Sequence, residues 1–435
     1  MKRSNTLVSV ALTGTMAGTS FAALCAVFAG SVSAGGFAIR EQSVESQGAS
    51  FAGSAAFGGL SSMYWNPAAA ANKDGLNFDS NYSVILPKAE ITTKAGTSLA
   101  LVGPNSSGDI GSPALVPASY ANYQFVNFDR NLYLGLGLNS PFGLSTEPEN
   151  NNYKGSVVGR TSRLFTLNVN PNLAYKVSPS LTLGAGVQRM YANGTFKFAT
   201  GVPAGPSTGF EGTGVAFGAT AGLMYTPTTS TTIGLGYRSR LTEKLEGNFY
   251  TNVLNPAGTA AKADIKLPDI VTLSLKQALT HNTRLLGTIE WSNWSRFEEL
   301  RVVRTTGPTA GTSLAVIDAS WQDGWMFALG GEYDVNSALT LRTGAAYEIS
   351  PIDAATKRIA GIPDSDRIWA SLGASYKWSD RTTFDLAYTH VFLKDAELDR
   401  LAAGTGFRVF ADTTASTDII SVGMKMKFGG AEPLK

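Results

Sequence analysis

The sequence contains a single cysteine, Cys25, and only two histidines, His281 and His390, in 435 residues. Cys25 lies in a segment that we expect to be removed on export. The mature chain would then have no disulfide, no cysteine-ligated zinc and no thiol nucleophile. The histidines fall in an expected short turn and an expected strand, which does not favour a Ser-His-Asp triad. With no metal-ligand cluster or phosphate-binding loop in the sequence, we expect no catalytic residue, no metal and no cofactor.

One stretch offers an alternative. Residues Gly205–Gly209 match the G-x-S-x-G pattern of serine hydrolases. A nucleophile elbow requires a strand before the serine and a helix after it. The surroundings here are rich in Gly and Pro, which favours a surface loop. A hydrolase acting on lipids therefore stays a minor alternative.

Charged residues are also scarce, at 16% of the chain, against about 25% in soluble domains. The formal net charge is +2, and two basic residues, Lys2 and Arg3, lie at the extreme N-terminus. The rest of the chain is balanced, which argues against a nucleic-acid partner. Low charge with 47 glycines and 10% aromatics suits strands that face lipid on one side and a lumen on the other.

Long hydrophobic runs are confined to the N-terminus. Residues 1–34 have a basic start, an apolar middle and small residues at the end, Val32-Ser33-Ala34. This order predicts a secretory signal peptide rather than a membrane anchor, because Thr, Gly and Ser interrupt the apolar part. No later stretch has about 18 uninterrupted apolar residues, so spanning helices are excluded.

From residue 76 to residue 428 the sequence repeats segments of alternating polarity. In the last of them, Ile420, Val422 and Met424 share one face and Ser421 and Gly423 the other. We count about 14 such segments, joined alternately by short turns and long loops. Single-chain bacterial barrels have an even number of strands and this alternation of connections. We therefore expect an all-β fold, a 14-stranded antiparallel transmembrane β-barrel, with a periplasmic tail over residues 429–435.

Residues 35–75 precede the first strand and show no alternation. They are rich in Gly, Ala and Ser and contain the turn-forming Asn66-Pro67-Ala68. About 14 strands enclose more space than wall side chains fill. We therefore expect this segment to form a hatch that plugs the lumen.

Several motifs, in their order and spacing, resemble the FadL/TodX family of outer-membrane transporters. They are Gly36-Phe37 through Gly48 and Gly53 to Asn66-Pro67-Ala68, then Gly137–Leu144, Asn170–Tyr175, Asp366–Trp369 leading to Gly373 and Tyr376, and Asp385–Phe392. The resemblance covers essentially the whole mature chain. It implies passive, ligand-gated uptake of long-chain fatty acids or related hydrophobic molecules across the outer membrane of a Gram-negative bacterium, with lateral exit through the barrel wall.

The resemblance also implies roles for particular residues. It implies that the ligand pocket is bordered by Gly35, Gly36 and Phe37. It implies that the hatch is anchored by Asn66, Pro67 and Ala68. The lateral exit would be formed by Gly137, Pro141, Phe142 and Gly143. An ordinary strand terminus explains Pro141 equally well. Arg160 and Arg163 are candidates to attract a carboxylate, although solvated rim charges are the plainer interpretation.

Other functions stay open at this stage. A channel of the same family for aromatic or alkane hydrocarbons is one alternative. A general diffusion porin is another, although a porin would have no function for the hatch. The expected partners are hydrophobic small molecules, outer-membrane lipid and lipopolysaccharide, and the barrel-insertion machinery. We expect a monomer. The chain continues for seven residues after Phe428, Gly429–Lys435, whereas many barrels end on the aromatic residue.

Overall fold

The computed structural model describes residues 35–251 and 255–428. The expected signal peptide over residues 1–34 and the expected tail over residues 429–435 lie outside the described residues. Within the described ranges, no helix is both long and apolar enough to span a membrane.

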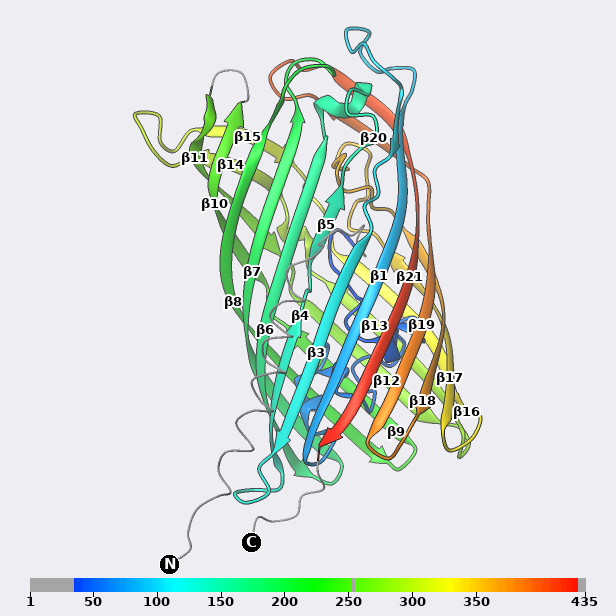
Figure 1. The fold of residues 1–435 in the computed structure, drawn as a ribbon. Coiled ribbons are helices and arrows are strands. Elements are labelled where there is room, and N and C mark those ends of the chain that lie inside the picture. Colours follow the sequence, from blue (N-terminus) through cyan, green and yellow to red (C-terminus); the bar gives the residue numbers. More distant parts are fainter. Residues whose placement is uncertain (1–34, 252–254, 429–435) are drawn as a thin grey trace, which may run out of the picture.

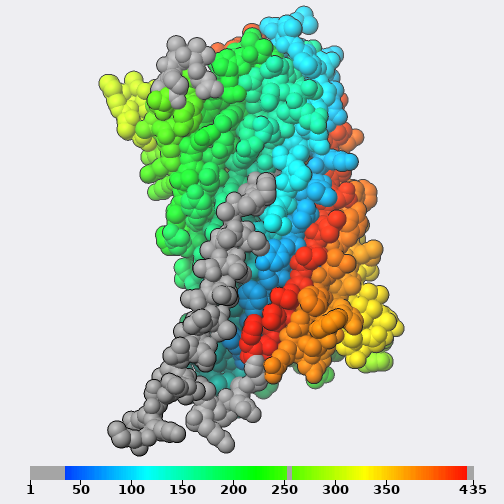
Figure 2. Space-filling model, viewed as in Figure 1, coloured from blue at the N-terminus to red at the C-terminus, as the bar shows by residue number. Residues whose placement is uncertain are grey.

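The strands form one closed antiparallel sheet. The first strand, β1 (Leu76–Thr93), pairs along its whole length with the last, β21 (Arg408–Phe428), and the register begins at Leu76 opposite Phe428. Both barrel ends therefore lie on the side of the short turns, at the bottom of Figure 1. On the face shown in Figure 2, β21 lies directly beside β1, so the wall is continuous where the sheet closes.

Within residues 35–251 and 255–428, twenty-one strand segments make up the wall. Seven wall strands are each divided into two of these segments, so the wall has the 14 strands that the sequence predicts. The divided strands are β2 (Ser106–Asp109) with β3 (Ala114–Gln124), β4 (Leu132–Asn139) with β5 (Gly143–Thr146), β9 (Thr231–Arg238) with β10 (Leu241–Thr251), β11 (Asn255–Leu267) with β12 (Ile270–Ala278), β13 (Thr283–Ser292) with β14 (Glu299–Arg304), β15 (Ser313–Asp318) with β16 (Gly324–Asp334), and β19 (Thr382–Leu393) with β20 (Ala396–Leu401). The undivided strands, besides β1 and β21, are β6 (Thr161–Ser178), β7 (Leu181–Ala199), β8 (Ser207–Thr228), β17 (Leu339–Ile349) and β18 (Arg367–Lys377).

Some expected boundaries were wrong. The apolar–polar alternation of membrane strands stops over residues 297–321 and 396–416, which predicts long loops there, but these residues contain β14, β15, β20 and the start of β21. These segments carry charged residues on their exposed face, as Arg301 and Glu299 do on β14. Because the outward face is no longer apolar in these segments, the polarity of the sequence predicts loops, although the backbone pairing of the strands continues.

The alternation of polarity matches the alternation of burial. On β21, Ile420 is 46% and Val422 52% exposed, whereas Ile419 and Ser421 are buried. The outward apolar faces are thus available to lipid, as in membrane barrels. Several aromatic residues near the strand ends have exposed side chains, as membrane barrels place them at the lipid–water boundary: Tyr175, Tyr225, Tyr333, Tyr376 and Trp378.

Residues 35–75, which we call the hatch, lie inside the barrel (Figure 1). The hatch contains one α-helical turn, α2 (Val44–Gln47), and two 3-10 helices, η1 (Leu60–Tyr64) and η2 (Pro67–Ala71). Its apolar side chains form a buried cluster with inward-facing residues of the wall. The core of this barrel is therefore made by the hatch and the inner face of the sheet together.

Candidate functional site

Asn66, Pro67 and Ala68 fasten the hatch to itself and to the wall. Asn66 is the N-cap of η2, because its Oδ1 accepts a hydrogen bond from the Ala68 N–H at 3.1 Å. Its Nδ2 donates to the carbonyl of Ala55 in the hatch and to that of Leu223 in β8, both at 2.9 Å. Pro67 occupies the first helical position, where its missing N–H costs nothing.

Glycines in the facing wall make this contact possible. A Cβ at Gly184 would lie 2.3 Å from the Ala68 nitrogen, one at Gly222 2.2 Å from Asn66 Oδ1, and one at Gly236 1.7 Å from the Trp65 carbonyl oxygen. A side chain at any of these three positions, which lie on neighbouring strands, would displace the hatch. The wall is therefore shaped to receive it.

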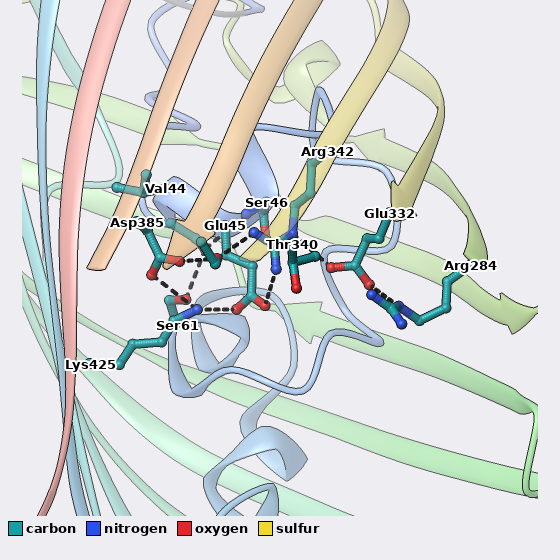
Figure 3. A network of polar contacts seen from close by, with 12 residues as sticks. Val44, Glu45, Ser46, Ser61, Arg284, Glu332, Thr340, Arg342, Asp385 and Lys425 are labelled. Atoms are coloured by element: carbon teal, nitrogen blue, oxygen red, sulfur yellow. Dashed lines mark hydrogen bonds and ion pairs between the residues drawn. The ribbon is translucent and has the colours of Figure 1, made fainter. Parts of the chain in front are cut away.

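Ion pairs hold the opposite side of the hatch. Glu45 of α2 projects between Lys425 of β21, at 2.8 Å, and Arg342 of β17, at 3.2 Å (Figure 3). The pairing continues into the wall, where Lys425 reaches Asp385 at 3.0 Å and Arg342 reaches Glu332 at 2.7 Å. One carboxylate of the hatch thus joins two separate parts of the barrel.

A second group of ion pairs lies nearer the start of the hatch. Arg40 is 7% exposed and pairs with Glu290 of β13 and, at 2.9 Å, with Glu348 of β17. The backbone N–H of Gly36 donates to Asp364 at 2.8 Å. Both ends of this segment are therefore held by carboxylates of the wall and its loops.

The beginning of the hatch pairs with the break in the third wall strand. Ala38 forms a β-bridge with Phe142, which lies between β4 and β5. The Ile39 N–H donates to the Pro141 carbonyl at 2.8 Å, and the Gly143 N–H donates to the Phe37 carbonyl at 3.0 Å. The structure thus brings Phe37, one of the sequence-predicted pocket residues, against Phe142 and Gly143 of the sequence-predicted exit.

Phe37 is the centre of an aromatic cluster that sequence reasoning missed. Its ring centroid lies 4.7 Å from that of Trp294, 5.5 Å from Phe297, 6.0 Å from Trp321 and 6.3 Å from Phe142. Trp294 lies in η4 (Trp294–Arg296). The three newly identified partners occupy the breaks that divide the ninth and tenth wall strands. Nothing in their local pattern marks them, except that aromatic residues three positions apart do not fit a strand.

A closed apolar cavity lies against Phe37. It is bordered by inward-facing residues of β6, β7 and β11, by the strand breaks, and by the loop after β17, including Leu164, Phe196, Ile265, Phe297 and Ile359. The volume of this cavity is ≈ 30 Å³, which is enough for about two water molecules. A long acyl chain therefore fits only if side chains such as that of Phe37 move away.

The two arginines predicted to meet a carboxylate lie elsewhere. Arg160 is buried among extracellular loops, where its guanidinium donates to the carbonyls of Asn151 and Pro203. Arg163 pairs with Glu147 on the outer rim, and both side chains are about half exposed. Neither lines the apolar cavity. Within the described residues, no group of three His, Cys, Asp or Glu side chains is arranged to hold a metal ion.

A closed lipid-facing barrel with its own N-terminal segment in the lumen defines an outer-membrane transport protein. Residues 25–428 match the family model "Outer membrane protein transport protein (OMPP1/FadL/TodX)", so the chain belongs to that family. It is an outer-membrane protein of a Gram-negative bacterium.

Relatives and solved structures agree with this assignment. The chain is 29% identical to outer membrane protein P1 of Haemophilus influenzae, covering 83% of this chain and 87% of that protein. It is 27% identical to the long-chain fatty acid transport protein of Escherichia coli O6:H1, covering 82% and 86%. The crystal structure of a Pseudomonas aeruginosa FadL homologue superposes with a TM-score of 0.80 at 22% identity, over 91% of this chain and all of that one. The toluene transporter TodX of Pseudomonas putida gives 0.65 at 17% identity, over 92% and 99%; these two likenesses show the fold.

Proposed function

We propose that the chain takes up long-chain fatty acids or related hydrophobic molecules by passive, ligand-gated transport. The observation that supports this is the apolar cavity beside Phe37, whose volume of ≈ 30 Å³ cannot hold a long acyl chain while Phe37 stays in place. Burial in it favours apolar cargo by about 0.8 kcal/mol per CH₂ group. We assign Gly35 and Gly36, which immediately precede Phe37, to the border of the same site. Their φ values are +36° and +71°, where a side chain would be strained.

Movement of Phe37 is coupled to the wall. Because Ala38 bridges Phe142, a cargo molecule that pushes Phe37 aside also pulls on the strand break at Pro141. Proline has no N–H to donate to the sheet, so this part of the wall is already weak. We place the lateral exit here, between Gly137 and Gly143, and we assign the anchoring of the hatch to Asn66, Pro67 and Ala68.

A disulfide between the hatch and the wall tests this route. Ala38→Cys with Phe142→Cys places two thiols across an antiparallel bridge, where Cα atoms are within disulfide range. The oxidised double variant should fail to take up labelled palmitate in cells that lack another such transporter, and reduction should restore uptake. Each single Cys variant is the matched control. Full uptake by the oxidised protein would rule out this exit.

Three alternatives have separate tests. An aromatic or alkane hydrocarbon channel of the same fold would take up toluene in preference to palmitate, which competition between the two labelled compounds measures. A general diffusion porin would pass steady, large currents in planar bilayers. A porin is disfavoured because the hatch packs against the inner face of the wall and occupies the lumen. A lipid hydrolase would cleave ester substrates, and we expect no such activity.

The remaining proposals concern assembly. We infer that export removes residues 1–34, so that the mature chain begins at Gly35, which an intact-mass measurement of the outer-membrane protein would verify. We expect a monomer surrounded by lipopolysaccharide and inserted by the barrel-insertion machinery. Deleting residues 429–435 and measuring insertion would show whether the tail after Phe428 affects recognition.

A further inference from the structure

Glu243 is a buried acid on the inner face of the barrel. Along β10, Leu241, Glu243 and Leu245 are buried, while Lys244 and Glu246 between and beyond them are exposed. Glu243 therefore shares the lumenal face with the two leucines. Its exposed fraction is 1%.

Among the described residues, the carboxyl group of Glu243 has no hydrogen-bond or ion-pair partner. Neither of its two carboxyl oxygens makes a hydrogen bond within residues 35–251 and 255–428, and no Lys, Arg or His of those ranges forms an ion pair with it. The backbone N–H of Ala216 lies near it without reaching hydrogen-bond geometry. By contrast, Glu45, Glu290 and Glu348 all pair with arginine or lysine. A buried polar group left unpaired is costly, so its presence calls for an explanation.

The surroundings of Glu243 belong to the cargo site. Across the ladder it is paired with Ile265, which borders the apolar cavity. Leu241, Leu245 and Phe37 are part of the same buried apolar cluster. Glu243 does not itself line the cavity, but its ladder partner Ile265 does, and side chains paired across a ladder lie on the same face of the sheet. The carboxyl group is therefore next to a lining residue, among apolar side chains that offer it no hydrogen bond.

We propose that Glu243 determines cargo specificity by donating a hydrogen bond to the oxygen of an uncharged head group, such as a hydroxyl, a carbonyl or a protonated carboxyl, on a long apolar molecule. This inference rests on the proposed function and adds a head-group class to it. A carboxyl surrounded by apolar groups is most stable in its neutral form, in which it can donate. A pure hydrocarbon would leave it unpaired.

An anionic head group fits less well. The cation that borders the cavity, Lys197, is already paired with Glu211 at 2.6 Å. A carboxylate placed beside Glu243 would therefore meet an acid with no cation free in the lining to balance it. An uncharged head group satisfies Glu243 without that cost.

The test compares two ligands of equal chain length. The full-length protein is placed in lipid nanodiscs, and binding of labelled 1-hexadecanol and hexadecane is measured with empty nanodiscs subtracted. Glu243→Leu should weaken hexadecanol binding about tenfold and leave hexadecane binding unchanged, as expected for the loss of one buried hydrogen bond. Glu243→Gln keeps a donor and should stay within about threefold of the wild-type affinity. Glu246→Gln, on the outer face of the same strand, is the matched control.

The ratio of the two affinities separates a specificity role from a structural one. If Glu243→Leu lowers both affinities equally, or changes neither, the inference is overturned while the proposed function stands. If the wild-type protein binds neither ligand, the inference is overturned, whereas the proposed function fails only if palmitate uptake is also absent. At about pH 9, where palmitate is ionised, the wild-type protein should prefer hexadecanol; the reverse order would overturn the choice of an uncharged head group.

Discussion

Replacing Glu45 by Gln should release the hatch. Glu45 is the carboxylate through which α2 contacts both Lys425 and Arg342 (Figure 3). The substitution keeps the size of the side chain and removes its charge. Two cations of the wall then lose one of their partners in a site where the side chains of Glu45 and Arg342 are 12% and 5% exposed.

The cost follows from what the cations keep. Breaking one side of a buried ion pair costs about 3–5 kcal/mol. Here Lys425 retains Asp385 at 3.0 Å and Arg342 retains Glu332 at 2.7 Å, and the Lys425 side chain is 22% exposed. We therefore expect a smaller loss of about 2 kcal/mol, which corresponds to a roughly thirtyfold rise in the ratio of released to seated hatch.

Planar-bilayer recording measures that ratio as the fraction of time in conducting states. Wild-type protein should conduct rarely, because the hatch fills the lumen, and Glu45→Gln should conduct far more often. Asp380→Asn is the matched control, since it removes an acid that pairs with Lys377 on an exposed turn. Equal conductance of wild type and Glu45→Gln would show that the ion pairs do not hold the hatch and would refute this reasoning.

Three further substitutions probe the contacts of the hatch and the rim. Gly236→Ala should destabilise the seated hatch by about 1–3 kcal/mol, because the added Cβ would clash with the hatch backbone. Gly287→Ala is the control and should not destabilise it, because the nearest atom to its added Cβ is 3.9 Å away. Hydrogen exchange of the hatch amides measures the difference. Asn66→Ala should cost about 1–3 kcal/mol in the same assay, since a cap and two bonds to carbonyls are lost. Arg163→Gln should leave palmitate uptake within about twofold of wild type, because its exposed pair with Glu147 contributes little; a larger loss would restore it as a ligand contact.

Sequence reasoning succeeded where a feature repeats locally. The two-residue alternation of β21 gives both the strand and its lipid-facing side, and Ile420 and Val422 are exposed as expected. The order of short and long connections gave the number of wall strands. It was least accurate beyond the membrane, as at β14 and β15, where outward residues are charged and the apolar signal disappears although the backbone remains paired.

The candidate site was only half visible in the sequence. Asn66-Pro67-Ala68 stood out because turn chemistry is a local property, whereas Phe37 was assigned to the site only through the family resemblance. Trp294 and Trp321 did not, because their relation to Phe37 arises from separations of more than 250 residues that the alternation does not encode. Arg163 does not reach the cavity because it lies on the outward face of β6, between Ser162 and Leu164, which line the cavity from the inward face.

The amino-acid sequence alone predicts a lipid-facing barrel and an N-terminal segment that is not part of its wall, because the period of the side chains and the lengths of the connections are local properties of the chain. The wall residues that contact this segment depend on the tertiary fold, since closure and register of the sheet bring β6, β11 and the strand breaks around one cavity. The isolation of Glu243 belongs to this second kind: a carboxyl has or lacks a partner only once the opposite wall is in place.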